Sequence, residues 1–141
     1  MYSINAFLVD DCNKIYVSGW GSNSEDIPGK TLSNMPLSAD AFQKTTDGQD
    51  FHLVVFEEDI ADLSYATYFG GNQTGDHVDG GTSRFDKRGI VYQSVCSSCP
   101  ENPLSSRISD FPTTPGAYSE SNPSPRCSNA SFKMAVVPFN L

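Results

Sequence analysis

The order of apolar and polar positions along the chain predicts a series of short β-strands. Apolar or alternating runs of about three to seven residues recur, and each ends in a cluster of Asp, Asn, Gly, Ser or Pro. Such runs are typical of strands separated by turns. We predict strands at 6–9, 15–18, 51–56, 63–69, 82–85, 90–95 and 131–137. The strands at 6–9 and 15–18, and those at 51–56 and 63–69, have the spacing of hairpins, and 57–62 is expected to be a loop.

The same succession of strand, polar turn and strand occurs twice, in NAFLVDDCNKIYVSGW at 5–20 and in HVDGGTSRFDKRGIVYQSVCSSC at 77–99. Ile15 and Ile90 are 75 positions apart, and Phe51 and Phe132 are 81 positions apart. The two values for the length of the repeat differ, which indicates a loop insertion in the second copy. We place repeat one at about 5–71 and repeat two at about 77–141, within a single β module of residues 1–141. Repeat two lacks a counterpart of the strand at 63–69.

Strand units repeated at a fixed period indicate β-propeller blades or a related stack of sheets. The expected fold class is therefore all-β, with two blade-like antiparallel sheets. Two blades cannot close a ring, so the chain is expected to be a fragment of a larger propeller or an open pair of sheets.

Composition and charge narrow the class of protein. Nine prolines and eleven glycines interrupt the stretches where a helix would run. The formal net charge of −8 argues against a nucleic-acid partner, because that affinity comes largely from Lys and Arg. No run approaches the ~20 apolar residues that span a bilayer. The first residues lack the basic region of a signal peptide, and we expect the chain to be a piece of a larger protein.

Four cysteines form an even set, as in small exported domains with disulfides. They allow three pairings, and the candidates are Cys12, Cys96, Cys99 and Cys127. A four-cysteine zinc site and free thiols are the alternatives. A redox motif at Cys96–Cys99 is disfavoured, because Pro100 and Pro103 oppose the helix that such a motif needs.

The residues also carry a family resemblance. YATYFGG at 65–71, IYVSG at 15–19 and DFPTTPGAY at 110–118 resemble the bacterial β-propeller repeat labelled SBBP. HVDGGTSRFD at 77–86 with GIVYQSVC at 89–96 resembles a segment of very large surface proteins of gliding Bacteroidetes, which carry PKD domains and a gliding-motility-associated C-terminal secretion domain. The resemblance covers about residues 5–137. It implies a secreted or cell-surface module linked to gliding motility and adhesion, and it implies no catalytic residues.

Three groups of residues are candidates for binding. Asp76, His77 and Asp79 have a spacing that offers a cation two carboxylates and an imidazole, although aspartates in turns more often accept backbone hydrogen bonds. The acidic residues of 57–62 offer oxygen ligands that suit calcium, although an acidic hairpin loop is more often only solvated. Trp20 stands between two glycines, where it either stacks on a sugar or packs between blades. His52 lies in an apolar strand and is expected to be packed rather than catalytic.

The leading hypothesis is a non-catalytic structural or interaction module of a secreted bacterial surface protein, binding cell-surface polysaccharide or other surface proteins. No cofactor is required by this hypothesis, although calcium remains a candidate. Self-association through open sheet edges is a further expectation. The rival is a secreted carbohydrate-active hydrolase or lyase on the same scaffold, because a fold does not fix a function.

Overall fold

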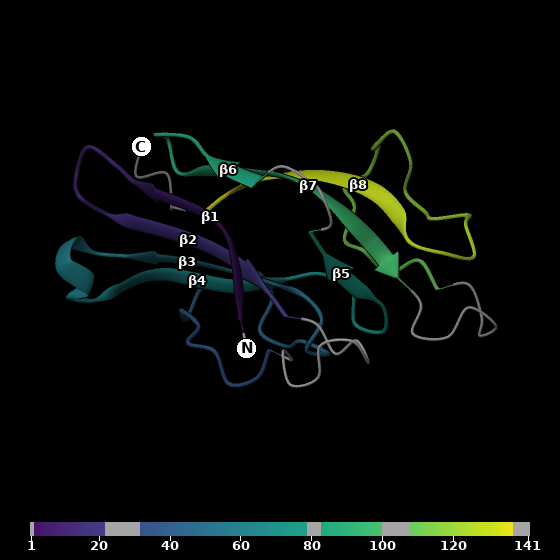
Figure 1. Ribbon diagram of the computed structural model, residues 1–141, viewed down its shortest axis with the longest axis horizontal. Coiled ribbons are helices and arrows are strands. Elements are labelled where there is room, and N and C mark those ends of the chain that lie inside the picture. The colour runs from purple at the N-terminus through teal and green to yellow at the C-terminus, as the bar shows by residue number, and fades with distance from the viewer. Residues whose placement is uncertain (1, 22–31, 79–82, 100–107, 137–141) are drawn as a thin grey trace.

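The computed structural model describes residues 2–21, 32–78, 83–99 and 108–136. Within these ranges, eight strands form two antiparallel sheets, and one short 3₁₀ helix lies in a connection between strands (Figure 1). The predicted all-β class is therefore confirmed. Among the described residues, no helix is long and apolar enough to cross a membrane.

The first sheet is a four-stranded meander in the order β1-β2-β3-β4. Its strands are β1 (Ser3–Val9), β2 (Ile15–Trp20), β3 (Phe51–Phe56) and β4 (Leu63–Phe69). They correspond to the first four predicted strands, whose aromatic and β-branched residues suit a pleated surface. The connection predicted as a loop contains the 3₁₀ helix η1 (Glu58–Ile60).

The second sheet consists of β5 (Gly75–His77), β6 (Ser83–Phe85), β7 (Ile90–Cys99) and β8 (Ser128–Ala135). Both β5 and β6 pair with β7, at successive parts of one edge, and β8 pairs with the other edge. The predicted bounds are wrong here in two ways. The strand predicted at 90–95 ends too early, because β7 continues through Ser97 to Cys99, and the strand predicted at 131–137 begins too late, because β8 begins at Ser128 and ends at Ala135. These polar residues carry no hydrophobic signal, and pairing with neighbouring strands keeps them extended.

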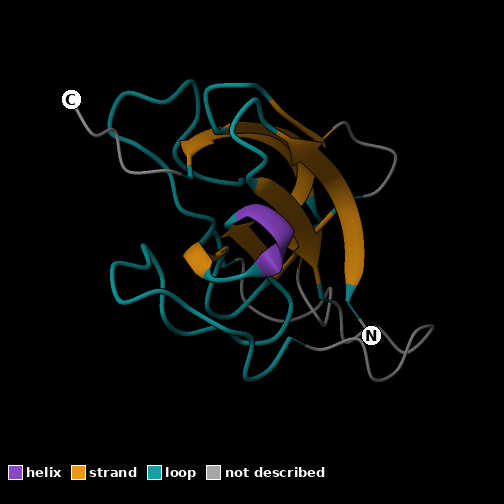
Figure 2. Ribbon diagram, turned by 90° about the vertical axis from the view of Figure 1, so that its left-hand side faces the viewer, coloured by secondary structure: helices purple, strands orange, loops and turns teal. Residues whose placement is uncertain are grey.

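The two sheets pack face to face, and their strands stack at the centre of the molecule with loops around them (Figure 2). Tyr16, Leu53, Val55 and Tyr65 of the first sheet share one buried cluster with Phe85, Val91 and Val136. A second cluster joins Phe51 and Phe69 to Val95. Burial of these aromatic and aliphatic side chains is the main force that holds the sheets together.

The turns of the β1–β2 and β6–β7 hairpins are the same structure, 76 positions apart. In each, one oxygen of an aspartate accepts two backbone N–H groups and the other accepts a tyrosine hydroxyl. The donors are Cys12, Lys14 and Tyr16 for Asp10, and Arg88, Ile90 and Tyr92 for Asp86. Asn13 and Gly89 occupy the same left-handed position of the turn, with φ values of 60° and 70°. The two hairpin turns thus share one hydrogen-bond pattern.

The structure corrects the predicted repeat register at two points. The turns are 76 positions apart, so Ile15 corresponds to Val91 and not to Ile90. Tyr16 lies opposite Val55, and the equivalent Tyr92 lies opposite Lys133. Phe132 therefore corresponds to Val54 and not to Phe51, as the sequence comparison predicted. The predicted offset is wrong by an odd number of residues, which places a side chain on the opposite face of the sheet.

Candidate functional site

The candidate ligand residues lie where the two sheets meet, at the ends of β2 and β5. Trp20 ends β2, His77 ends β5, and their ring centroids are 5.6 Å apart. Trp20 is half-buried and packs against the cluster of Phe51, Phe69 and Val95. Of its two predicted roles, packing between sheets is the one that this position supports, since much of the indole is already occupied by protein contacts.

Asp76 is buried and accepts hydrogen bonds from the backbone. Its carboxylate accepts hydrogen bonds from the N–H groups of Gly71, at 2.7 Å, and Ser98, at 2.9 Å. Burial raises the pKa of Asp76 to about 7, although these two hydrogen bonds oppose the rise. Both oxygens are engaged in joining β5 to β7 and to the end of β4, which matches the turn interpretation of this residue. Asp79 lies outside the described residues.

Two aspartates that the sequence did not single out complete an acidic cluster around Gly70 and Gly71. Asp110 accepts hydrogen bonds from the N–H groups of Asn72 and Gln73, each at 2.7 Å, and from the Thr74 hydroxyl. It therefore fixes the connection between β4 and β5. No sequence motif identifies the role of Asp110, because its hydrogen-bond donors lie more than thirty positions away in the chain.

Asp50, the other missed residue, is fully buried directly before β3. One of its oxygens accepts a hydrogen bond from the Thr46 hydroxyl at 2.5 Å, and Oδ1 has no partner. Burial raises the pKa of Asp50 to about 8, and the carboxylates of Asp47, Asp76 and Asp110 raise it further, against the effect of the Thr46 hydrogen bond. A Cβ on Gly70 would collide with Asp50 Oδ1 and stand 2.9 Å from Asp76 Oδ2, so glycine is required between them.

The cysteines form one disulfide, between Cys99 at the end of β7 and Cys127 just before β8. The prediction of disulfides is thus met for one pair, whereas Cys12 and Cys96 are thiols. Cys99 Sγ lies 3.7 Å from Nδ1 of His77, which places the bridge beside the Trp20–His77 pair. The disulfide joins neighbouring strands and closes the loop between them.

The remaining candidates have structural partners. His52 is buried between the rings of Tyr2 and Tyr68, and its Nε2 lies 2.9 Å from the carbonyl oxygen of Pro36. Burial lowers its pKa, so the neutral form is favoured. Near η1, Glu57 forms an ion pair with Lys14, with 2.9 Å between Oε1 and Nζ. In the described parts of the chain, no group of three or more His, Cys, Asp or Glu side chains is arranged to hold a metal ion. Calcium stays a prediction.

A scan against protein-family models, a search of curated proteins and a search of solved structures each found no match.

Proposed function

We propose that this chain is a non-catalytic structural and interaction module of an exported bacterial surface protein, in which blade-like sheets stack face to face. One observation carries the proposal. The outer face of the first sheet presents apolar side chains at the positions through which the second sheet is packed in the interior.

The two similar hairpins identify equivalent residues in the first and second sheets. Phe85 and Val91 face each other across β6 and β7, and they are 7% and 0% exposed because the first sheet covers them. Their equivalents, Val9 and Ile15, face each other across β1 and β2. Val9 is 46% exposed, and Ile15 is half-buried.

The exposed apolar surface extends along both strands of the hairpin. Phe7 lies opposite Val17 and is 64% exposed, and Ile4, nearby on β1, is 66% exposed. We call the residues Ile4, Phe7, Val9, Ile15 and Val17 the outer patch. Contiguous exposed apolar side chains mark interaction surfaces in soluble proteins. The partner of this patch is a sheet whose face resembles the one that carries Tyr16, Leu53, Val55 and Tyr65.

A chain with one additional repeat tests the stacking role. A copy of residues 2–77 is inserted before Tyr2, which adds one period of the hairpin repeat. Phe7→Asp is then introduced at the natural Phe7 in both the two-sheet and the three-sheet chain. In the two-sheet chain the substituted side chain stays in water, so we expect a change in the free energy of unfolding of less than about 0.5 kcal/mol.

In the three-sheet chain the added sheet covers part of Phe7, because the equivalent Ser83 is half-buried, so the same substitution is expected to cost about 1–2 kcal/mol. Tyr118→Asp is the matched control, because Tyr118 is fully exposed and lies in the connection between β7 and β8 rather than on the first sheet. Equal effects of Phe7→Asp in both chains would refute stacking. A natural chain that dimerises, and that Phe7→Asp makes monomeric, would assign the patch to a second copy instead.

The rival hypothesis of a glycan hydrolase or lyase has its own test. Asp50 and Asp76 have the raised pKa values that acid–base carboxyl groups often show, but they are 0% and 1% exposed. Substitution of each acid by alanine, with assays of polysaccharide degradation, separates the alternatives. Turnover that disappears with one carboxylate would contradict the non-catalytic proposal.

A further inference from the structure

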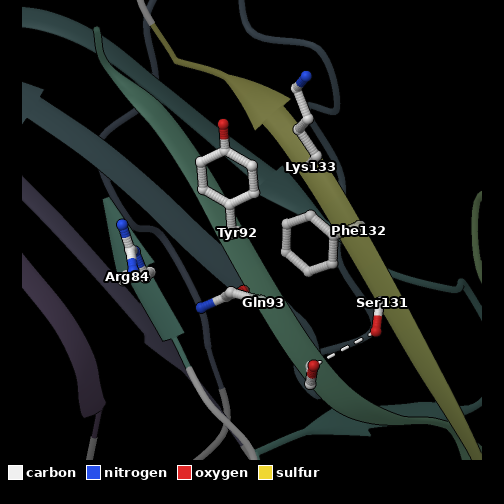
Figure 3. A pocket seen from close by; sticks show the side chains of 7 residues that line it. Arg84, Tyr92, Gln93, Ser131, Phe132 and Lys133 are labelled. Carbon is white, nitrogen blue, oxygen red and sulfur yellow. Dashed lines mark hydrogen bonds between the residues drawn. The ribbon is translucent and has the colours of Figure 1, made fainter. Parts of the chain in front are cut away.

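The outer face of the second sheet differs from the outer patch, because it is polar and basic. Arg84, Tyr92 and Lys133 lie in one row across β6, β7 and β8, as the register of the strands requires. Figure 3 shows these side chains along three adjacent strands. Neighbouring strands are about 4.8 Å apart, so the backbones of Arg84 and Lys133 stand roughly 10 Å apart with Tyr92 between them.

A shallow groove of about 330 Å³ runs over this row. Next to Tyr92, Ser94 and Ser131 face each other across β7 and β8, with their hydroxyl oxygens 3.3 Å apart. Both serines are exposed. Together they place two hydroxyl groups, each able to donate and accept a hydrogen bond, at one end of the groove.

The cations of the groove carry uncompensated charge in an acidic chain. The net charge is −8, and Lys14, Lys87 and Arg88 each form an ion pair with a carboxylate. Within the described ranges, neither Arg84 nor Lys133 forms an ion pair. A local positive potential on a negative molecule attracts an anion to this groove in particular.

The tyrosine ring is held in place and half-exposed. The Tyr92 hydroxyl donates a hydrogen bond to Asp86 Oδ2 at 3.2 Å, and Arg88 occupies the same carboxylate oxygen at 2.8 Å. Asp86 is thus neutralised locally and does not cancel the charge of the groove. Lys133 Nζ lies 6.0 Å from the centre of the Tyr92 ring. A fixed aromatic ring flanked by cations and hydroxyl groups has the chemistry that recognises a sugar bearing an anionic group.

We propose that this groove binds acidic glycans, with Tyr92 stacking on a sugar ring, Arg84 and Lys133 contacting its carboxylate or sulfate groups, and the two serines bonding its hydroxyl groups. The two cations can neutralise few phosphates, and polynucleotide affinity rests largely on neutralising many phosphates with Lys and Arg. The groove lies on a different sheet from the outer patch, so its role is independent of stacking.

Titration of the natural chain with tri-galacturonic acid tests the proposal, with maltotriose as the neutral comparison and backbone amide NMR shifts as the readout. We expect shifts in β6, β7 and β8 with the acidic trisaccharide, weaker binding at higher salt, and at least tenfold weaker binding of maltotriose. Arg84→Gln combined with Lys133→Gln should raise the Kd for the acidic trisaccharide about tenfold or more. Both side chains are exposed, so the fold is expected to remain intact.

The matched control is the pair Lys44→Gln and Arg126→Gln, which removes the same charge from exposed positions away from the groove. Equal losses in the two double variants would show that net charge alone is responsible, and they would overturn the proposal. It would also be overturned by the absence of shifts in the three strands, by equal binding of maltotriose, or by tighter binding of single-stranded DNA.

Discussion

At the scale of single residues, the buried acids around Gly70 make stability depend on pH. Asp50 and Asp76 have folded-state pKa values of about 8 and about 7, raised by burial above the ordinary value of 3.8. The folded state therefore holds protons that the unfolded state releases. The stabilisation linked to these protons is complete below about pH 4 and is lost as the pH rises through about 7 to 8.

Asp50→Asn keeps the shape of the protonated acid and removes its titration. We expect the natural chain to lose about 2 kcal/mol or more in the free energy of unfolding between pH 5 and pH 8.5. The variant should lose clearly less, and urea unfolding at the two pH values measures both. Asp40→Asn, at an exposed position, is the control. A natural chain that is equally stable at both pH values would contradict this account of Asp50.

Single residues also show why much of the candidate site was not predictable. Trp20 and His77 stand out by residue type, and the structure does bring their rings together. Asp50 and Asp110 are two of seventeen acids. Burial distinguishes Asp50, and the backbone N–H groups of a distant segment distinguish Asp110. These contacts arise from the tertiary fold, so no local pattern contains them.

At the scale of elements, the aspartate turn is the repeated unit. The pKa of Asp86 is lowered to about 2, since the hydrogen bonds from Arg88 and the backbone outweigh desolvation. The turn therefore contributes stability above about pH 4, and this contribution is lost as the pH falls through about 2.

Removal of either aspartate is expected to destabilise its hairpin. Asp10→Ala and Asp86→Ala each leave two backbone N–H groups and a tyrosine hydroxyl without their acceptor, so each should lower the Tm. Asp11→Ala is the control, because Asp11 is exposed and forms an ion pair with Lys87. A loss from Asp11→Ala as large as from Asp10→Ala would contradict the specific role of the turn.

Elements differ in how far the sequence determines them. Strands rich in aromatic and β-branched residues, such as β3 and β4, were predicted with their bounds. The end of β7 was not, because Ser97 and Ser98 are polar and are buried by pairing and by the hydrogen bond to Asp76. The predicted register of β8 was wrong for a related reason. Phe132 is compatible with either face of the sheet by residue type, and only its pairing with Gln93 fixes the face on which it lies.

At the scale of the molecule, the disulfide limits the freedom of the unfolded chain. Cys99 and Cys127 are separated by 28 positions, and closing a loop of that length stabilises a fold by about 3–4 kcal/mol. Cys127→Ser, or reduction of the natural chain, should lower the free energy of unfolding in urea by about this amount. Cys12→Ser should change it little, because Cys12 is an exposed thiol. A Cys127→Ser chain as stable as the natural one would contradict a stabilising role of the disulfide.

Apolar contacts join the two sheets, and the buried amide of Gln93 in β7 adds polar contacts at their interface. Its Nε2 donates to Ser18 Oγ at 2.8 Å in the first sheet and to Ser83 Oγ at 3.2 Å in its own sheet. Gln93 is 2% exposed, so loss of its side chain leaves a cavity and unsatisfied hydroxyl groups at the interface.

Gln93→Ala should therefore cost about 2–3 kcal/mol, and Gln93→Glu should cost more at neutral pH, because it places a charge where water is excluded. Ser94→Ala, one position along β7 on the exposed face, is the control. If the sheets fold as one unit, near- and far-ultraviolet circular dichroism should report the same lower midpoint for Gln93→Ala. Two separate transitions in the natural chain would instead mean that each sheet is stable alone, and that their contact is an interface between independent blades.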